Sequence, residues 1–322
     1  MAYEGNSDKL NRGDITLAIM RPVLRRVMHV LFVLCCGFKV GSAQTVTLGV
    51  LEDVRGADAG EPNSHKVRVL FKKNVDHWEA FPSNCPDQGC LKTVSSKYPR
   101  EVVWTVAFDG RDIGRITGRT PKEFHFYSHV GLQEVISAGP VPTVGKRSAE
   151  YGGSTDASVY RPLVAISQPF FEDPDSWKVS QVSSGLITLL RKQFRKQYPK
   201  LCRASKQDED KLEPFSYHDE DVSLAKSYAS KKGWRAARLH LAEAIACDDV
   251  EAGFEIDDPW FVITPKEAVQ YLDAGMWLVD AGDYDNDGKS EVLFSINRYN
   301  IGGYELFYDD FKRRATFEFN YH

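Results

Sequence analysis

The chain has 322 residues, enough for one large domain or two small ones, and it carries 45 acidic and 41 basic residues. Its formal net charge of −4 at pH 7 disfavours general nucleic-acid binding, because that binding needs an excess of Lys and Arg to neutralise phosphates. Past the first 43 residues no apolar run is long enough to cross a bilayer, so we expect no membrane span in the mature chain.

The first segment, residues 1–43, has the pattern of an N-terminal extension followed by a secretory signal peptide. Basic residues ending at Arg26 precede an apolar run over 27–38, and small residues stand at Gly41 and Ala43. A basic region, a short apolar run and a small-x-small exit are typical of an export signal, although an uncleaved anchor or a buried helix is the alternative. Cleavage after Ala43 removes six basic and three acidic residues and leaves an exported chain with a net charge of −7. We expect a periplasmic or extracellular location.

Four cysteines remain after this segment, at Cys85, Cys90, Cys202 and Cys247. An even count in an exported chain favours disulfides, and the economical pairing joins Cys85 to Cys90 and Cys202 to Cys247. The alternatives are a redox pair or a metal site, but both usually have C-x-x-C spacing, which this chain lacks. We therefore expect two structural disulfides, with the pairing left open among three possibilities.

Residues 44–200 form a β-rich region in which alternating and β-branched runs predict strands. The expected strands are 45–51, 66–71, 102–108, 111–117, 124–128 and 163–166. The dipeptide Asp109-Gly110 predicts a tight hairpin between the third and the fourth. One amphipathic helix is expected over 185–198, capped by Ser183 or Ser184 and stopped by Pro199. Its second face is basic, which indicates either a solvated helix surface or an anionic partner.

Residues 201–275 are expected to form a disulfide-linked insertion and a hairpin. Strands are predicted at 224–229 and 234–241, although the Ala-rich stretch 234–246 also suits a helix. The final region, 276–322, has four strand candidates separated by turns: 277–280, 291–297, 304–308 and 315–321. The predicted fold class is therefore mainly β, with antiparallel sheets and one or two short helices.

The most specific pattern is a loop with four acids, Asp283, Asp285, Asp287 and Glu291, and a glycine at its sixth place, Gly288. Close carboxylates repel one another unless a cation neutralises them. Many flexible oxygen ligands suit Ca²⁺ better than Mg²⁺, and a glycine permits the sharp turn around the ion. The loop is not an EF-hand, because position 12 is Phe294 instead of Glu and both flanks are predicted strands. A metal-free Asp/Gly-rich turn is the alternative.

The loop resembles the FG-GAP or VCBS repeat, which is known from bacterial secreted proteins and from the β-propellers of integrin α-subunits. In that family an apolar strand leads through Gly-Asp into an Asp-x-Asp-x-Asp-Gly-x-x-Asp loop, and a second apolar strand follows. Here residues 277–283 match the entry and 291–294 the exit, with Glu291 in place of the usual Asp. The resemblance covers 276–322 and implies a propeller-type blade with a structural Ca²⁺, held by the side chains of Asp283, Asp285, Asp287 and Glu291 and the carbonyl of Lys289.

These features favour an exported binding or envelope-associated module with a protein or carbohydrate ligand. The alternative is an exported hydrolase in which calcium only shapes the scaffold. The hydrolase reading predicts a pocket with a perturbed acid or histidine around His125, His129 or Glu134. With Glu123 or Glu134 nearby, the two histidines also suit a transition metal, although such histidines are more often structural.

Overall fold

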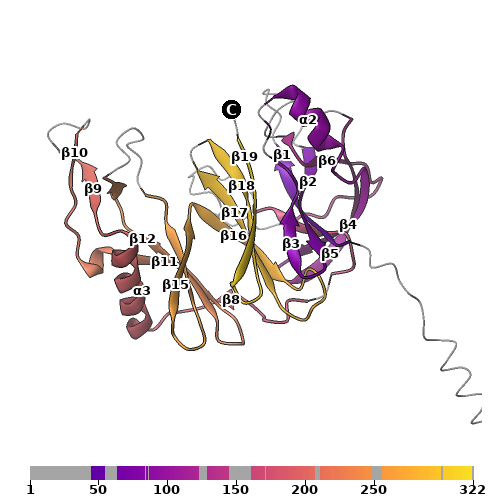
Figure 1. Ribbon diagram of the computed structural model, residues 1–322. Helices are drawn as coiled ribbons and strands as arrows, with labels where there is room; N and C mark the ends of the chain where they lie inside the picture. Colours follow the sequence, from indigo (N-terminus) through magenta and orange to yellow (C-terminus); the bar gives the residue numbers. More distant parts are fainter. Residues whose placement is uncertain are drawn as a thin grey trace, which may run out of the picture. The chain divides into compact units, whose positions relative to one another are not determined.

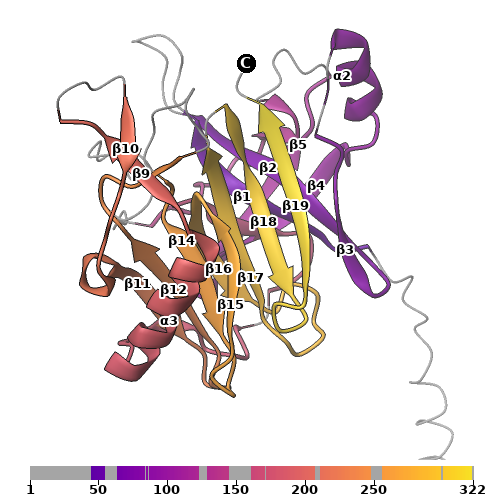
Figure 2. The same cartoon turned by 60° about the vertical axis from the view of Figure 1, so that its left-hand side comes forward.

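The computed structural model describes residues 45–54, 64–83, 85, 87–122, 129–144, 161–170, 172–206, 211–247, 256–298 and 300–320. The expected signal segment, 1–43, and the expected strand at 124–128 lie outside the described residues. Within these ranges the chain is mainly β, all paired strands are antiparallel, and two α-helices are present (Figures 1 and 2). The predicted fold class is confirmed.

The N-terminal sheet closes on itself into a barrel. Its strands lie in the order β1-β7-β4-β5-β6-β2, and β2 pairs back onto β1, while β3 pairs with β2 at the side. The bounds are β1 Thr47–Val54, β2 Ser64–Asn74, β3 His77–Ala80, β4 Glu101–Phe108, β5 Arg111–Arg119, β6 Leu132–Val135 and β7 Leu163–Ile166. Asp109 and Gly110 both have positive φ in the turn between β4 and β5, as the predicted hairpin requires.

The barrel interior is filled by a large aromatic side chain that needs a small neighbour. Trp104 is fully buried, and its indole N–H donates to Gln133 Oε1 at 2.9 Å. Gly118 lies against both, since a Cβ at this position would stand 2.4 Å from Gln133 Oε1 and 2.8 Å from Trp104 Nε1. The glycine therefore leaves room for the indole and its buried hydrogen bond.

Gly118→Ala is accordingly expected to destabilise the protein by about 1–3 kcal/mol, because the added methyl group overpacks the barrel. Urea unfolding followed by tryptophan fluorescence measures this. Gly139→Ala is the control: a Cβ at Gly139 meets nothing within 4 Å, so its effect should stay within about 0.5 kcal/mol. Equal unfolding midpoints for the two variants would show that Gly118 has no packing role.

Helix α2, Gln88–Ser95, was not predicted from the sequence. It begins where Asp87 Oδ1 accepts the amide of Cys90 at 2.8 Å, and the disulfide Cys85–Cys90 ties its first turn to the preceding segment. Its apolar residues Leu91 and Val94 pack into the barrel core cluster. The helix is short, so the disulfide and the cap stabilise it together with this packing.

The middle of the chain forms a five-stranded sheet in the order β15-β14-β12-β11-β8 and a three-stranded sheet in the order β10-β9-β13. The bounds are β8 Lys178–Val179, β9 Leu201–Ala204, β10 Leu212–Pro214, β11 Ser223–Ala229, β12 Arg235–His240, β13 Ile245–Ala246, β14 Pro259–Ile263 and β15 Val269–Ala274. The second disulfide, Cys202–Cys247, joins β9 to the residue after β13. Both disulfides are therefore confirmed, and they follow the economical one of the three pairings that the sequence left open.

Helix α3, Ser184–Gln197, packs on β15 and begins at the predicted cap, Ser183. Leu186, Leu190 and Phe194 form its buried face. The basic face is partly engaged within the protein, because Arg195 pairs with Asp219 at 2.7 Å in the 3-10 turn η2, Asp219–Asp221. No described helix is both long and apolar enough to traverse a bilayer.

The C-terminal sheet is a four-stranded meander, β16-β17-β18-β19, in which β17 and β18 are buried on both faces while β19 alternates buried and exposed residues. Its bounds are β16 Met276–Gly282, β17 Glu291–Arg298, β18 Ile301–Tyr308 and β19 Arg313–Asn320. Along β17, Leu293 belongs to the core cluster shared with the barrel, while Val292 and Phe294 belong to the cluster shared with the middle sheet. The meander has the strand order that a propeller blade would have, but the N-terminal sheet is a closed barrel instead of a second blade.

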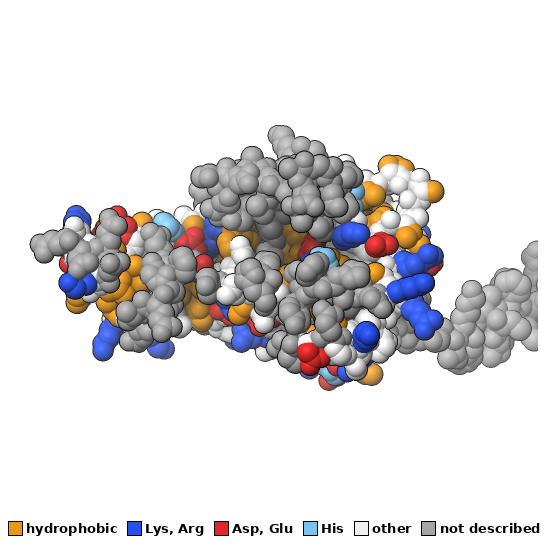
Figure 3. Space-filling model, turned by 90° about the horizontal axis from the view of Figure 1, so that it is seen from above, with side chains coloured by type: hydrophobic (Ala, Val, Ile, Leu, Met, Phe, Trp, Pro, Cys, Tyr) orange, Lys and Arg blue, Asp and Glu red, His pale blue; other side chains and the backbone are white. Residues whose placement is uncertain are grey.

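Charged side chains of both signs are mixed on the face shown in Figure 3. This agrees with the small formal net charge of −4.

Candidate functional site

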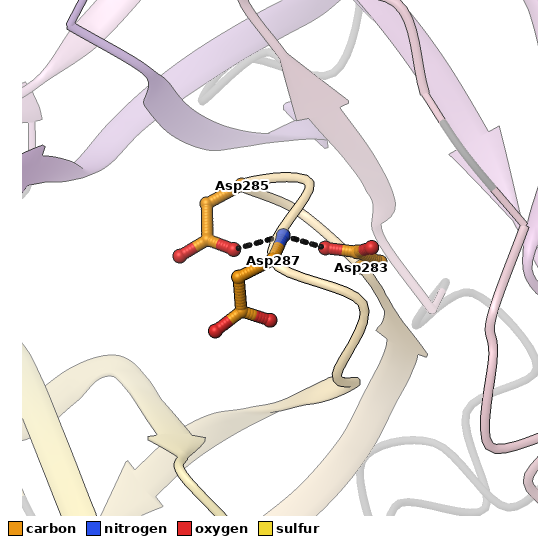
Figure 4. A group of neighbouring side chains, drawn as sticks. All are labelled: Asp283, Asp285 and Asp287. Carbon is orange, nitrogen blue, oxygen red and sulfur yellow. Dashed lines mark hydrogen bonds between the residues drawn. The ribbon is translucent and has the colours of Figure 1, made fainter. Parts of the chain in front are cut away.

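The acidic loop between β16 and β17 brings three of the predicted calcium ligands together. One carboxylate oxygen from each of Asp283, Asp285 and Asp287 lies within 4.8 Å of the others (Figure 4). Asp283 is buried and Asp287 is exposed, so the cluster opens to solvent at one side. Among the described residues this is the only group of three or more such side chains placed to hold a metal ion.

Main-chain amides fix these carboxylates in place. The amide of Asp287 donates to Asp283 Oδ1 at 3.0 Å and to Asp285 Oδ1 at 3.2 Å, as Figure 4 shows. The amide of Gly288 donates to Asp283 Oδ2 at 2.9 Å. Asn286 and Gly288 both have positive φ, 64° and 81°, and this curls the chain so that successive amides face the acids. The backbone of the loop itself thus holds the carboxylates of Asp283 and Asp285 in place.

The other two predicted ligands are placed differently. Glu291 is 2% exposed, and its Oε2 accepts the amide of Tyr284 at 2.8 Å, so it braces the loop from inside and is not one of the three clustered acids. The side chain of Lys289 pairs with Asp309 at 2.9 Å, and its amide donates to Asp287 Oδ1 at 2.8 Å. The ammonium group of Lys289 therefore pairs with a carboxylate outside the three-acid cluster.

The electrostatics of the loop favour a bound cation. Burial, and then the charge of Asp285, raises the pKa of Glu291 well above its ordinary value. Burial also raises the pKa of Asp283, although amide hydrogen bonds oppose this. The ion pair between Lys73 of β2 and Asp285 supplies one positive charge against four acids. The side chains of the four acids offer only oxygen atoms as ligands, and most of them are anionic. Such ligands fit a hard divalent cation such as Ca²⁺.

The loop also connects other parts of the fold. Tyr284 is fully buried in the barrel core cluster, and its carbonyl accepts a hydrogen bond from Gln168 at 3.0 Å. Ser290 accepts the amide of Asp175 at 3.1 Å and donates to Asp173. An ion in this loop would therefore tighten the junction between the meander, the barrel and the segment that precedes β8.

A cleft of about 1010 Å³ lies beside this junction. It is lined by the β4–β5 turn, the 172–179 segment, the middle sheet and β16. Its walls combine aromatic and charged side chains, among them Phe108, Trp177, Tyr228, Trp277, Arg161 and Asp280. This site was not predicted from the sequence, because its residues come from several segments far apart in the chain.

Asp280 anchors one end of the cleft. Its Oδ2 accepts the amide of Asp109 at 2.8 Å, its Oδ1 accepts the amide of Ala281 at 2.8 Å, and Arg161 lies 3.6 Å away. Burial raises the pKa of Asp280 to about 6, even though Arg161 and the amide of Ala281 lower it. The side chain thus ties the β4–β5 turn to β16, at an electrostatic cost when it is ionised.

This raised pKa predicts a pH effect on stability. An acid with a higher pKa in the folded state stabilises the fold while protonated and loses that contribution as the pH rises through the folded pKa. The free energy of unfolding should therefore fall by about 2 kcal/mol more between pH 4 and 6 in the native protein than in Asp280→Asn. Urea unfolding at several pH values measures the difference. Asp112→Asn, an exposed acid on the same hairpin, should behave like the native protein; identical pH profiles for all three proteins would refute the assignment.

The histidine-centred pocket that the hydrolase reading expects is only partly covered by the described residues. His125 and Glu123 lie outside them. His129 precedes β6, and Glu134 on β6 is largely exposed and lies 3.8 Å from Lys66. Neither His129 nor Glu134 lines the cleft.

Comparison of the chain with protein-family models, curated proteins and solved structures found no match. The evidence for the two candidate sites therefore comes from their residues alone. The acidic loop was predicted from the sequence, and the cleft was found in the structure.

Proposed function

We propose that this is an exported binding protein whose C-terminal loop holds a structural calcium ion, as in the FG-GAP or VCBS repeats it resembles. The observation that carries the proposal is the convergence of Asp283, Asp285 and Asp287, held by main-chain amides around one point. Two disulfides support an oxidising, non-cytosolic location, where calcium is also plentiful. The ligand class is a protein or a carbohydrate.

In this proposal calcium acts on the scaffold. Asp283, Asp285 and Asp287 would hold the ion, with Glu291 and the carbonyl of Lys289 as further ligands. When bound, the ion supplies positive charge that offsets repulsion among the acids. Because Ser290 holds the segment that leads to β8, the same loop also steadies one wall of the cleft.

Calorimetric titration of the metal-stripped full chain with Ca²⁺ tests the proposal. We expect binding of one ion per chain with a dissociation constant near the 10⁻⁴–10⁻³ M range of extracellular modules, and weaker binding of Mg²⁺. Absence of binding heat, together with an unchanged melting temperature in calcium, would end the calcium proposal.

The hydrolase alternative has one observation in its favour, the raised pKa of Asp280 within the cleft. However, both oxygens of Asp280 already accept main-chain amides. We therefore give Asp280 a structural role and prefer the binding function to the hydrolase alternative. Turnover of a glycoside or ester substrate that is lost in Asp280→Asn would reverse this order.

A further inference from the structure

The side chain of Lys73 reaches the acidic loop from the barrel. Its ammonium group forms an ion pair with Asp285, and the two side chains are only 17% and 3% exposed. Within the part of the chain that the structure describes, no other Lys or Arg side chain pairs with one of the three clustered acids. Because the pair is shielded from water, salt screens it less than a surface ion pair. The cluster therefore lies beside one positive charge that the protein itself supplies.

Neighbouring residues hold Lys73 in this place. Its amide donates to the carbonyl of Val46 at 2.8 Å, and its Cα is directly opposite that of Trp78 on β3. The ammonium group lies 5.5 Å from the ring centre of Trp78 and 5.9 Å from that of Tyr308, at the end of β18. Aromatic ring faces attract a cation at such distances. The ammonium group thus has favourable contacts on the barrel side that do not depend on Asp285.

A bound calcium ion and the ammonium group of Lys73 would compete for Asp285. The Oδ2 atom of Asp285 pairs with the lysine, and its Oδ1 accepts the amide of Asp287. A divalent ion held by Asp285 would lie close to the ammonium group, and like charges repel strongly where water is mostly excluded. Binding of the ion and retention of the ion pair therefore oppose each other.

We infer that Lys73 is a built-in competitor that sets the calcium affinity of the acidic loop. In the ion-free protein its ammonium group neutralises Asp285 and lessens the repulsion among the acids. When calcium binds, the ammonium group leaves Asp285 and stays over the rings of Trp78 and Tyr308. The charge of Lys73 thus steadies the loop without calcium and weakens its affinity for the ion. This inference rests on the calcium function proposed above and names the residue that regulates it.

A purely structural ion pair would have the opposite effect on calcium binding. If Lys73 only tied the barrel to the loop, its loss would loosen the loop and weaken the binding of the ion. If Lys73 competes with calcium, its loss strengthens that binding. The sign of the change in the dissociation constant therefore separates the two roles.

Calorimetric titration of metal-stripped Lys73→Met with Ca²⁺ tests the inference. Methionine keeps an apolar side chain of similar length against Trp78 and Tyr308 but carries no charge. We expect the dissociation constant to fall at least about tenfold, because the competing group and its repulsion of the ion are both gone. Lys72→Met is the matched control. Lys72 is also on β2 but pairs with Glu79 at 3.2 Å, so its removal should change the dissociation constant by no more than about twofold.

Thermal unfolding gives a second readout. In chelator, Lys73→Met should melt below the native protein, because the acids lose the counter-charge of the lysine. In saturating calcium this difference should shrink, since the ion then neutralises the acids and stabilises the variant more than the native chain. Lys72→Met should differ from the native protein by the same amount in both conditions.

Crystal structures of the native chain, grown with calcium and with chelator, decide the result if Lys73→Met fails to fold by circular dichroism. We expect the Lys73 Nζ atom to pair with Asp285 in chelator and to lie more than about 4 Å from its carboxylate oxygens in calcium.

Three outcomes would overturn the inference while the native chain still binds calcium and the proposed function stands. They are an unchanged or higher dissociation constant in Lys73→Met, an equal loss of its melting temperature with and without calcium, and a calcium-loaded crystal structure in which Lys73 still pairs with Asp285. Absence of calcium binding by the native chain and by Lys73→Met alike would overturn both. Binding by Lys73→Met alone would support the inference and contradict the proposed function, because the native lysine would then exclude the ion.

Discussion

Replacing Cys202 and Cys247 together by alanine is expected to lower the free energy of unfolding by about 4 kcal/mol. The bridge joins residues 45 positions apart, so its loss frees a long loop in the unfolded chain. It also joins β9 to the end of β13, within a small sheet whose own strands are only two to four residues long. Such short strands stabilise the sheet weakly by themselves.

The second disulfide provides the matched control. Cys85 and Cys90 are five positions apart, and their double replacement by alanine should cost about 2 kcal/mol. Cys85 and Cys202 are equally buried, each 7% exposed, so the two double variants differ mainly in loop length. Urea unfolding under non-reducing conditions measures both. A long bridge that costs no more than the short one would show that loop closure does not govern their contributions.

Calcium is expected to raise the stability of the native protein by about 2.7 kcal/mol when its concentration is a hundredfold above the dissociation constant. For a chain of this size that corresponds to a rise in melting temperature of about 4–5 °C. The physical reason is that the ion binds the folded loop, whose carboxylates are already aligned by the amides of Asp287 and Gly288. The unfolded chain has no such arrangement to bind.

Asp287→Asn is expected to abolish most of this rise. Asn keeps an oxygen that can accept the amide of Lys289 but removes one negative charge from the cluster. Asp310→Asn removes the same charge in the turn between β18 and β19 and should retain the full calcium effect. Thermal unfolding with calcium or with a chelator compares the three proteins. An equal calcium shift in both variants would exclude the acidic loop as the binding site.

Much of the local structure followed from the sequence. The β4–β5 hairpin, β7 and α3 matched their patterns because each is decided by nearby residues: a turn dipeptide, a short β-branched run, or a cap with an apolar period. The clustering of Asp283, Asp285 and Asp287 was also predictable, since all three lie in one short loop. The even cysteine count predicted two disulfides, and the structure has the economical one of the three possible pairings.

Elements with weak or atypical local signals were missed. β14 has five consecutive buried residues and no alternation, because Trp260 and Phe261 face two different cores. The strand predicted over 234–241 is confirmed as β12, and the helix that its Ala-rich sequence also suited does not form, since Ala236 and Ala237 pack into those same two cores. In both cases burial on two faces removed the polar half of the strand pattern.

Long-range pairing was not readable at all. Closure of the barrel depends on β6 pairing with both β5 and β2, and nothing in those segments specifies the partner. The ion pair between Lys73 of the barrel and Asp285 could not be predicted from the sequence either, and neither could the grouping of residues around the cleft. Sites built from distant segments appear only when the sheets are assembled.

The central claim is that the loop between β16 and β17 is a calcium site, and a crystal structure of the full chain grown in calcium tests it most directly. The account predicts one ion contacted by Asp283, Asp285 and Asp287 at about 2.3–2.6 Å, with Glu291 or the Lys289 carbonyl completing the coordination. The calcium anomalous signal identifies the ion. A loop that in saturating calcium holds no ion, with Lys73 still paired to Asp285, would contradict the account.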